Sequence, residues 1–372
     1  MTDTAPVTAP RIEVRLDRVE QNAAILVARL GAKGIRVTGV TKATLGMPEV
    51  AAVLVAAGVA ALGESRIEGI ERLRTAGITV PLVLIRSPMP SQVDRVVAAA
   101  DVSFNTEADV LDLLAEAACR QARVHGVVLM VELGDLREGL LAADLDETAR
   151  RVVASPHLDL RGIGTNLACQ SGVVPDEAKM AELSALAGSL ERSLGIRLAV
   201  VSGGNSANLA WAFSAADIGR VDDLRLGEAI LLGTDPLDRS PIDGLHTDAF
   251  TIVGEVIEAK VKPTRPWGAV GNSAFGTPPR AADRGPAGRA IVALGEHDID
   301  PASLTPPPGI VVLGASSDHL VLDTGSVVVR PGDELRFGVG YPALLRAMTS
   351  PFVAQVLLRS GAAAPTPAFS TP

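Results

Sequence analysis

The most constraining feature of this sequence is an alternation of strand-like and helix-like segments that repeats eight times between residues 35 and 233. Short runs rich in β-branched residues alternate with Ala- and Leu-rich stretches of helical period, such as 107–122 and 176–194. The expected strands are 36–41, 59–63, 80–85, 101–105, 124–133, 158–167, 196–204 and 224–233. Eight such units are what a (β/α)8 barrel requires. A doubly wound open sheet is the alternative, but eight units are many for it, and no G-x-G-x-x-G motif follows a strand.

The pattern changes after residue 240. Residues 243–358 carry β-rich runs separated by Pro- and Gly-rich connections, at 251–262, 289–294, 309–314, 319–323 and 326–337. The segment 11–17 precedes the first helix and is expected to pair with these strands. The sequence therefore predicts an α/β chain with three parts. These are a TIM-like barrel over 17–240, a second, β-rich domain made of 1–16 plus 241–360, and a disordered tail over 361–372.

Composition excludes several classes of partner. The net charge is −9 and no basic block occurs, which argues against nucleic acid or an anionic membrane surface as a partner. The first ten residues do not read as a signal peptide, and no uninterrupted apolar run is long enough to span a bilayer. Two cysteines are too few for a disulfide framework or a Cys-rich zinc site. We expect a cytoplasmic protein that acts on a small molecule and has no metal site.

Lys42 is the first candidate for chemistry. Only five lysines occur among the 34 basic residues, and this one follows the apolar run 37–41. It stands at the C-terminal end of the first expected barrel strand, the end at which barrels carry their chemistry. An amine held there partly out of water can attack an aldehyde. The alternative is a lysine whose amine extends to solvent at the barrel rim.

Two glycine-containing turns follow the last two expected barrel strands, in the segments SGGNSAN (202–208) and LRLGEAILLG (224–233). Glycines let backbone N–H groups approach an anion, and Asn205 or Ser206 can cap the next helix. Barrels commonly bind phosphate at these turns, although each taken singly also reads as an ordinary tight turn. Arg225 lies inside the last strand and needs an acceptor there. A neutral pyridine nitrogen would serve, and a surface salt bridge is the alternative.

Together, the lysine, the SGGNSAN loop and the R-x-G strand resemble the alanine-racemase-like enzymes of fold type III, which use pyridoxal 5'-phosphate (PLP). Within that family the chain is most similar to the ornithine racemase branch. Further matching stretches are VTKATLG (40–46), GESRIEGIERL (63–73), VELGDLREG (131–139), GIGTNLACQSGVVP (162–175), LGASSDHLVLD (313–323) and YPALLRAMTSPFV (341–353). The resemblance implies a homodimeric racemase that moves the α-proton of a free amino acid, ornithine or another basic one, between two bases.

The resemblance also assigns roles to single residues. Lys42 is implied to be the Schiff-base lysine, and Arg225 to be the partner of the pyridine nitrogen. The residues implied to hold the phosphate are Ser206, Gly227 and Glu228, the last through its backbone N–H. Asn205, next to Ser206, is a further candidate for binding the cofactor.

Three further assignments follow from the same resemblance. Asn166 falls where relatives carry a histidine on the cofactor side, and Arg137 falls near their carboxylate-steering arginine. Asp318 falls where the loop of the partner subunit meets the substrate, which gives it a catalytic and substrate-binding role.

The second base departs from the family pattern. Alanine racemases use a tyrosine from the C-terminal domain, but the corresponding stretch here, GNSAFG (271–276), contains Phe275, which cannot ionise. Tyr341 is the one tyrosine of the chain and is therefore our candidate for the second base. A tyrosine that only anchors the last β-turn is the alternative reading, and the other candidates are Cys169, His297 and His319. The remaining histidines near strands, His125 and His157, are expected to be solvated.

Two other functions stay open on the sequence. One is a D-amino-acid aldolase or dehydratase that uses the same cofactor. The other is a non-catalytic PLP-carrier protein, which is built from the barrel alone. The additional β-rich domain argues against the carrier.

Overall fold

The computed structural model describes residues 7–272 and 283–359. Its chain divides into two compact units, one made of Met1–Asp17 with Asp248–Pro372 and the other of Arg18–Thr247. Phe275 and the expected disordered tail, 361–372, lie outside the described residues.

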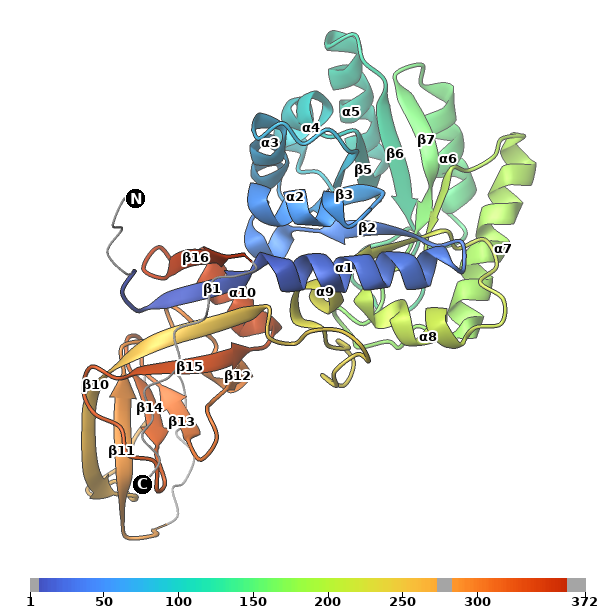
Figure 1. Ribbon diagram of the computed structural model, residues 1–372. Helices are drawn as coiled ribbons and strands as arrows, with labels where there is room; N and C mark the ends of the chain where they lie inside the picture. Colours follow the sequence, from blue (N-terminus) through green and yellow to red (C-terminus); the bar gives the residue numbers. More distant parts are fainter. Residues whose placement is uncertain (1–6, 273–282, 360–372) are drawn as a thin grey trace. The chain divides into compact units, whose positions relative to one another are not determined.

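The unit Arg18–Thr247 contains a closed barrel of eight strands, in which neighbouring strands run parallel (Figure 1). The strands are β2 (Arg36–Val40), β3 (Ala61–Glu64), β4 (Leu82–Leu84), β5 (Val102–Asn105), β6 (His125–Met130), β7 (Leu158–Gly164), β8 (Val200–Ser202) and β9 (Asp223–Leu226). Parallel strands are buried on both faces, which explains why they appear in the sequence as apolar runs without strict alternation. The predicted barrel is confirmed, and the open doubly wound sheet is wrong.

Helices lie outside the ring, the first before the first barrel strand and the others each after one strand (Figure 1). They are α1 (Leu16–Gly31), α2 (Pro48–Ala56), α3 (Ile67–Thr75), α4 (Val93–Ala99), α5 (Ala108–Arg120), α6 (Leu145–Ala154), α7 (Glu177–Leu194), α8 (Leu209–Ser214) and α9 (Glu228–Leu232). The helix expected over 176–194 has clear local causes. Asp176 caps its first turn by accepting a hydrogen bond from the Lys179 backbone N–H at 2.8 Å, and Gly195 ends it with φ 66°. In the described ranges, no helix combines the length and apolarity needed to cross a bilayer.

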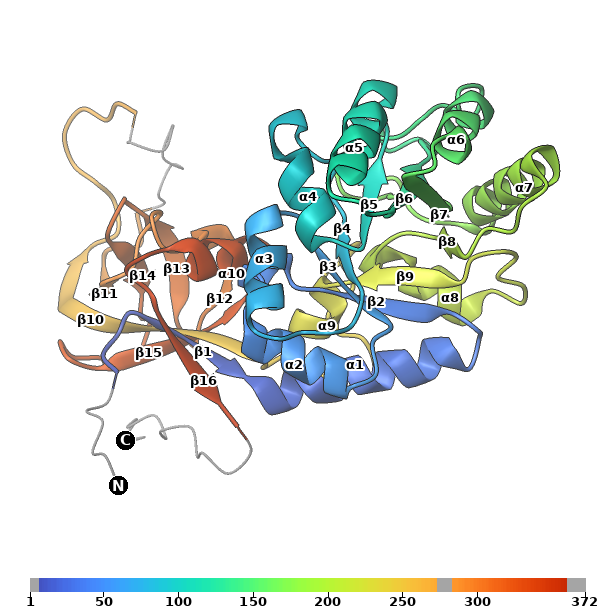
Figure 2. The same cartoon turned by 90° about the horizontal axis from the view of Figure 1, so that it is seen from above.

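The other unit is built on an antiparallel sheet (Figure 2). Its first strand, β1 (Arg11–Arg15), pairs antiparallel with β10 and parallel with β16. The remaining strands are β10 (Phe250–Pro263), β11 (Pro286–Val292), β12 (Leu304–Thr305), β13 (Val311–Ala315), β14 (Leu320–Asp323), β15 (Glu334–Val339) and β16 (Ala354–Leu358). The N-terminal segment thus joins the C-terminal strands, as its sequence indicated.

Two expectations for this unit are wrong. The strand expected over 326–337 begins only at Glu334, because Pro331 and Gly332 form a turn and proline has no N–H to offer a ladder. Residues 341–349 lie in the part expected to be β-rich, where no helix was expected, and they form helix α10 (Tyr341–Thr349). This helix has a proline in its first turn and buries four residues at helical spacing, namely Ala343, Leu344, Ala347 and Met348.

Candidate active site

Lys42 lies at the C-terminal end of β2, as the sequence predicted. Thr41 ends the strand with a backbone hydrogen bond from its N–H to the Gly63 carbonyl at 2.9 Å, and Lys42 then begins a short 3-10 turn, Lys42–Thr44. Leu45 and Gly46 have φ values of 55° and 64°, which turn the chain back toward α2. The Lys42 side chain is half-buried. Its amine is thus at the barrel mouth and partly shielded from water.

A buried carboxyl group, Glu64, supports this turn from the end of the neighbouring strand β3. Glu64 is 2% exposed and accepts hydrogen bonds from the Thr41 hydroxyl at 3.1 Å and the Ser65 backbone N–H at 2.7 Å. Burial raises the pKa of Glu64, and these donors oppose that rise. Gly69 leaves room for the Glu64 side chain, because a Cβ at position 69 would lie 2.5 Å from the Glu64 Cγ. Glu64 was not among the site residues expected from the sequence.

The loop after β8 has the capped form that the sequence suggested. The Asn205 side chain accepts a hydrogen bond from the Ala207 backbone N–H at 2.8 Å, and the Asn208 side chain accepts one from the Asn205 backbone N–H at 3.0 Å. Gly204 has φ 144°, and a Cβ there would lie 2.1 Å from the Asn208 Oδ1. The loop therefore requires glycine at this position.

The two glycine turns lie against each other. The Ala229 backbone N–H, in the first turn of α9, donates to the Ser206 hydroxyl at 3.2 Å. In the described part of the chain, no acceptor is found for the backbone N–H groups of Ser206, Gly227 and Glu228. Backbone donors next to glycines at a helix start are the usual means of holding an anion.

These turns also adjoin β2, the strand that Lys42 follows. Strand β2 pairs with β9, and a Cβ on Gly227 would lie 3.3 Å from the Val40 Cβ. Burial raises the pKa of the Glu228 carboxyl, whereas its ion pair with Arg239 and the nearby Lys42 charge lower it. The amine and the backbone donors thus belong to one region of the barrel mouth.

Arg225 is buried inside the barrel, with 5% of its surface exposed. Its guanidinium donates to the Ser202 hydroxyl at 2.5 Å and to the Thr165 carbonyl at 2.6 Å, and it lies 4.8 Å from the ring centre of Phe104. Burial lowers its pKa to about 10, so it stays charged at neutral pH. Arg225 is buried and its hydrogen-bond acceptors among the described residues are neutral oxygens, so the surface salt bridge considered for it is wrong.

Asn166 and Asn205 connect Arg225 with the first of the two glycine turns, SGGNSAN (202–208). The Asn205 side-chain amide donates to the Asn166 Oδ1 at 3.1 Å, and Arg225 reaches the same oxygen at 3.5 Å. The Asn166 Nδ2 is a buried donor for which the described residues provide no acceptor. An unsatisfied buried donor at a barrel mouth indicates a group that the protein chain itself does not supply.

Arg137 and Cys169 lie on neighbouring loops of the mouth. Arg137 forms an ion pair with the adjacent Glu138, and the Cys169 sulfur lies 3.4 Å from the Asn205 side-chain nitrogen. Asp135, which the sequence analysis missed, fixes the loop of Cys169 by accepting backbone N–H bonds from Cys169, Gln170 and Ser171 at 3.2, 2.9 and 3.0 Å.

The remaining site candidates belong to the other unit. Asp318 accepts a hydrogen bond from the Ser317 hydroxyl at 2.6 Å, and His297 Nδ1 lies 3.4 Å from its second oxygen. The Ser317 hydroxyl lowers the Asp318 pKa, and the neighbouring histidines add to this effect. Tyr341 is the half-buried first residue of α10. The structure thus brings Asp318 and His297 together.

His125 is not solvated, contrary to the expectation from the sequence. It is the first residue of β6, whose six residues are all buried, and it is 2% exposed. Its Nε2 lies 2.8 Å from the Ser103 hydroxyl. Burial lowers the pKa of His125 to about 4. This histidine is part of the strand itself rather than of the segment before it, and it is buried in the barrel wall.

Comparison with known proteins gives consistent results. A family model described as "Alanine racemase, N-terminal domain" matches residues 14–235. The chain is 40% identical to lysine racemase of Thermotoga maritima, over 93% of this chain and 98% of that protein. It is 34% identical to ornithine racemase of Acetoanaerobium sticklandii, over 94% and 99% of the two chains. The crystal structure of alanine racemase from Streptomyces lavendulae shares the fold, with a TM-score of 0.72 and 21% identity over 95% of this chain and 98% of that one. The chain therefore belongs to the alanine racemase family, of PLP fold type III, and is an amino-acid racemase.

Proposed function

We propose that this chain is a PLP-dependent racemase of a free basic amino acid, lysine or ornithine. The observation that carries the proposal is the likeness to a lysine racemase and an ornithine racemase over 93% and 94% of the chain. Members of the alanine racemase family use PLP. Both relatives act on amino acids that end in an amine, which supports a substrate of that class.

The barrel mouth of this chain fits PLP. The cofactor has an aldehyde, a phosphate and a pyridine nitrogen, and each has a matching group here. The Lys42 amine suits the aldehyde, and the donors of Ser206, Gly227 and Glu228 suit the phosphate. Arg225 is a buried cation with a rigid fork of donors, which suits the ring nitrogen. The unsatisfied Asn166 Nδ2 adds a donor on the same side.

Each residue would have a separate role in the reaction. PLP, when bound, supplies an electron sink that makes the α-proton of an attached amino acid acidic. Lys42 would hold the cofactor, and its Nζ would then hold and move a proton on one face of the α-carbon. Arg225 would donate to the ring nitrogen and keep it unprotonated, since a guanidinium with a pKa of about 10 does not give up its proton at neutral pH. Asn205 would keep the Asn166 side chain oriented.

Racemisation also needs a proton-moving group on the opposite face. We assign this role to Tyr341, the one phenol of the chain. Arg137 would steer the substrate carboxylate, and Asp318 would contact the substrate from the partner subunit of a homodimer. In such a dimer the second chain would exclude water from the barrel mouth.

The two rival functions have less support. The relatives with 40% and 34% identity are both racemases, which disfavours an aldolase or a dehydratase. A carrier protein needs only the barrel, whereas this chain matches the racemases through its second unit as well.

A panel of amino acids tests the proposal. The purified protein with PLP is incubated with single enantiomers, and the products are separated by chiral chromatography. Lysine or ornithine should racemise fastest. An aldolase or dehydratase would instead release an aldehyde or a keto acid, and a carrier would turn over nothing.

The role of Lys42 has its own test. Borohydride reduction of the loaded protein should leave a covalent adduct on Lys42, and Lys42→Ala should lose the near-visible absorption band. Lys33→Ala is the matched control, because Lys33 precedes the same strand at the opposite end of the barrel and donates to the Ala215 carbonyl at 2.8 Å. An adduct on another lysine would contradict the assignment.

A further inference from the structure

The interior of the barrel beneath Arg225 is polar. Barrel interiors are usually filled by layers of branched apolar side chains. Here the Ser202 hydroxyl accepts a hydrogen bond from Arg225 and donates one to Asp223. Asp223 accepts a second hydrogen bond from the Thr38 hydroxyl, at 2.7 Å. Asp223 precedes Arg225 by two positions on β9, so both side chains point to the same face of the strand, into the barrel.

The hydrogen bonds of this network converge on Asp223. Arg225 can only donate, so the Ser202 oxygen must accept from it. The one proton of Ser202 is then free to go to Asp223, whose oxygens accept from Ser202 and from Thr38. An amide at position 223 could still accept from Ser202 through its oxygen, but it would turn its NH2 group toward Thr38 and would carry no negative charge. Only a carboxylate accepts from both hydroxyls at once and places a negative charge behind Ser202.

Burial works against that carboxylate. Asp223 is 6% exposed, and burial raises its pKa, while Ser202, Thr38 and the Arg225 charge lower it. A buried acid without direct contact to a cation is costly to a fold, and a well-packed apolar residue is usually at least as stable. Stability alone therefore gives little reason for Asp223.

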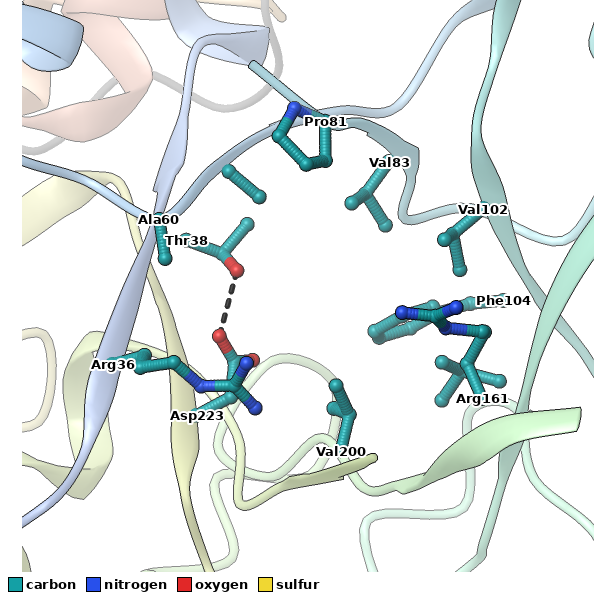
Figure 3. Close-up of a pocket in the computed structure, with 12 residues that line it drawn as sticks. Arg36, Thr38, Ala60, Pro81, Val83, Val102, Phe104, Arg161, Val200 and Asp223 are labelled. Atoms are coloured by element: carbon teal, nitrogen blue, oxygen red, sulfur yellow. Dashed lines mark hydrogen bonds between the residues drawn. The ribbon is translucent and has the colours of Figure 1, made fainter. Parts of the chain in front are cut away.

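Packing in the same region is also incomplete. A cavity of about 130 Å³ lies at the N-terminal end of the barrel and is lined by Thr38, Phe104 and Asp223 (Figure 3). The rest of its wall is largely apolar and includes Val83, Val102, Val128 and Val200. A larger apolar side chain at position 223 could extend into this cavity and fill part of it. Phe104 lines this cavity and also lies 4.8 Å from the Arg225 guanidinium. The hydrogen-bonded residues Thr38 and Asp223 thus border the cavity, on the N-terminal side of the Arg225 guanidinium.

We propose that Asp223 is a positioning residue that acts through Ser202 to fix the orientation of the Arg225 guanidinium. The inference rests on the proposed function, since it concerns the way Arg225 faces PLP. A direct ion pair would occupy two N–H groups of the guanidinium fork, whereas the hydroxyl between the two groups uses one nitrogen. The carboxylate stabilises the buried cation from a distance and leaves other donors for the cofactor.

The test is a double-mutant cycle on cofactor binding. PLP is titrated into the apoproteins of the wild type, Asp223→Asn, Arg225→Lys and the double variant, and the dissociation constant and the near-visible spectrum are recorded. Loss of a hydrogen bond to a charged group predicts about tenfold weaker binding for Asp223→Asn. The same substitution should have no further effect in the Arg225→Lys background, because Asp223 acts through Arg225.

Asp222→Asn is the matched control. It changes the net charge equally at the neighbouring position, but Asp222 bonds Arg36 at 3.1 Å and the Val201 backbone N–H at 2.8 Å, outside the chain of Ser202. If Asp223→Asn fails to fold, as judged by the circular dichroism of the apoprotein, Ser202→Ala replaces it and should give the same tenfold loss.

The outcomes separate the inference from the proposed function. If Asp223→Asn binds PLP as tightly as Asp222→Asn does, the positioning role is wrong. It is also wrong if Asp223→Asn weakens PLP binding by the same factor in the Arg225→Lys background as in the wild type. If the wild type does not bind PLP at all, the proposed function itself fails.

Discussion

Acid should destabilise the barrel through His125. This histidine is 2% exposed, and burial lowers its pKa from 6.5 to about 4. The unfolded chain therefore binds a proton near pH 6.5, whereas the folded chain binds it only near pH 4. Whenever the unfolded state holds more protons, stability falls as the pH falls. At pH 8 His125 therefore does not change the free energy of unfolding. From pH 6.5 down to pH 4 it lowers that free energy by a growing amount.

The size of the penalty follows from the pKa difference. One pKa unit corresponds to about 1.4 kcal/mol, which gives a loss of about 2 kcal/mol at pH 5 and about 3 kcal/mol at pH 4. His125→Gln removes the ionisation and keeps an amide that can hydrogen-bond the Ser103 hydroxyl. The free energy of unfolding of the wild type should therefore fall by about 2 kcal/mol more than that of the variant between pH 8 and pH 5.

Urea unfolding followed by tryptophan fluorescence measures this difference. Trp211 is 6% exposed within the barrel unit, whereas Trp267 is 85% exposed, so the signal change reports mainly the barrel. Other titrating groups affect the wild type and the variant alike and cancel in the comparison. His157→Gln is the matched control at a half-buried histidine. Equal losses in the wild type and in His125→Gln would refute the argument.

Three further predictions concern the proposed active site. Gly204→Ala should weaken PLP binding at least about tenfold in absorbance titrations, because its Cβ would lie 2.1 Å from the Asn208 Oδ1; unchanged affinity would remove this loop from the phosphate site. Tyr341→Phe should nearly abolish racemisation, yet one enantiomer should still exchange its α-proton with deuterated solvent, as followed by NMR; near-normal racemisation would exclude Tyr341 as a base. Mixed Lys42→Ala and Asp318→Ala proteins should regain part of their lost activity after subunit exchange, and a fully active monomer in sedimentation would contradict the homodimer.

The fold was predictable where local and global signals agree. The barrel strands are buried on both faces, so each appears as an apolar run, and helices such as α7 carry their own start and end residues. Helix α10 was missed because its apolar stretch is short, and short runs do not distinguish a buried helix from a strand. The strand expected over 326–337 was too long because its apolar residues continue through a turn.

The candidate site was predictable only in part. Lys42 and Arg225 were found because a charged residue next to an apolar run is conspicuous, and because the ends of barrel strands meet in space. Glu64, Asp135 and Asp223 were missed, although all three are buried. In the sequence each stands in a stretch that contains other charged or polar residues, and nothing there marks it as buried. Their donors are backbone N–H groups and hydroxyls from other segments, which only the folded chain brings within hydrogen-bond distance.

The electrostatics of Arg225 bear on the choice among PLP reactions. A protonated pyridine nitrogen makes the cofactor a strong electron sink, which favours reactions beyond simple proton transfer. In the proposed site, a guanidinium with a pKa of about 10 would not protonate that nitrogen at neutral pH and would only donate a hydrogen bond to it. PLP with an unprotonated ring nitrogen would then still make the α-proton acidic enough to remove. Return of the proton to the α-carbon would have a lower barrier than the competing reactions. Held in place by Ser202, and through it by Asp223, Arg225 would favour racemisation over aldol cleavage or dehydration on the same fold.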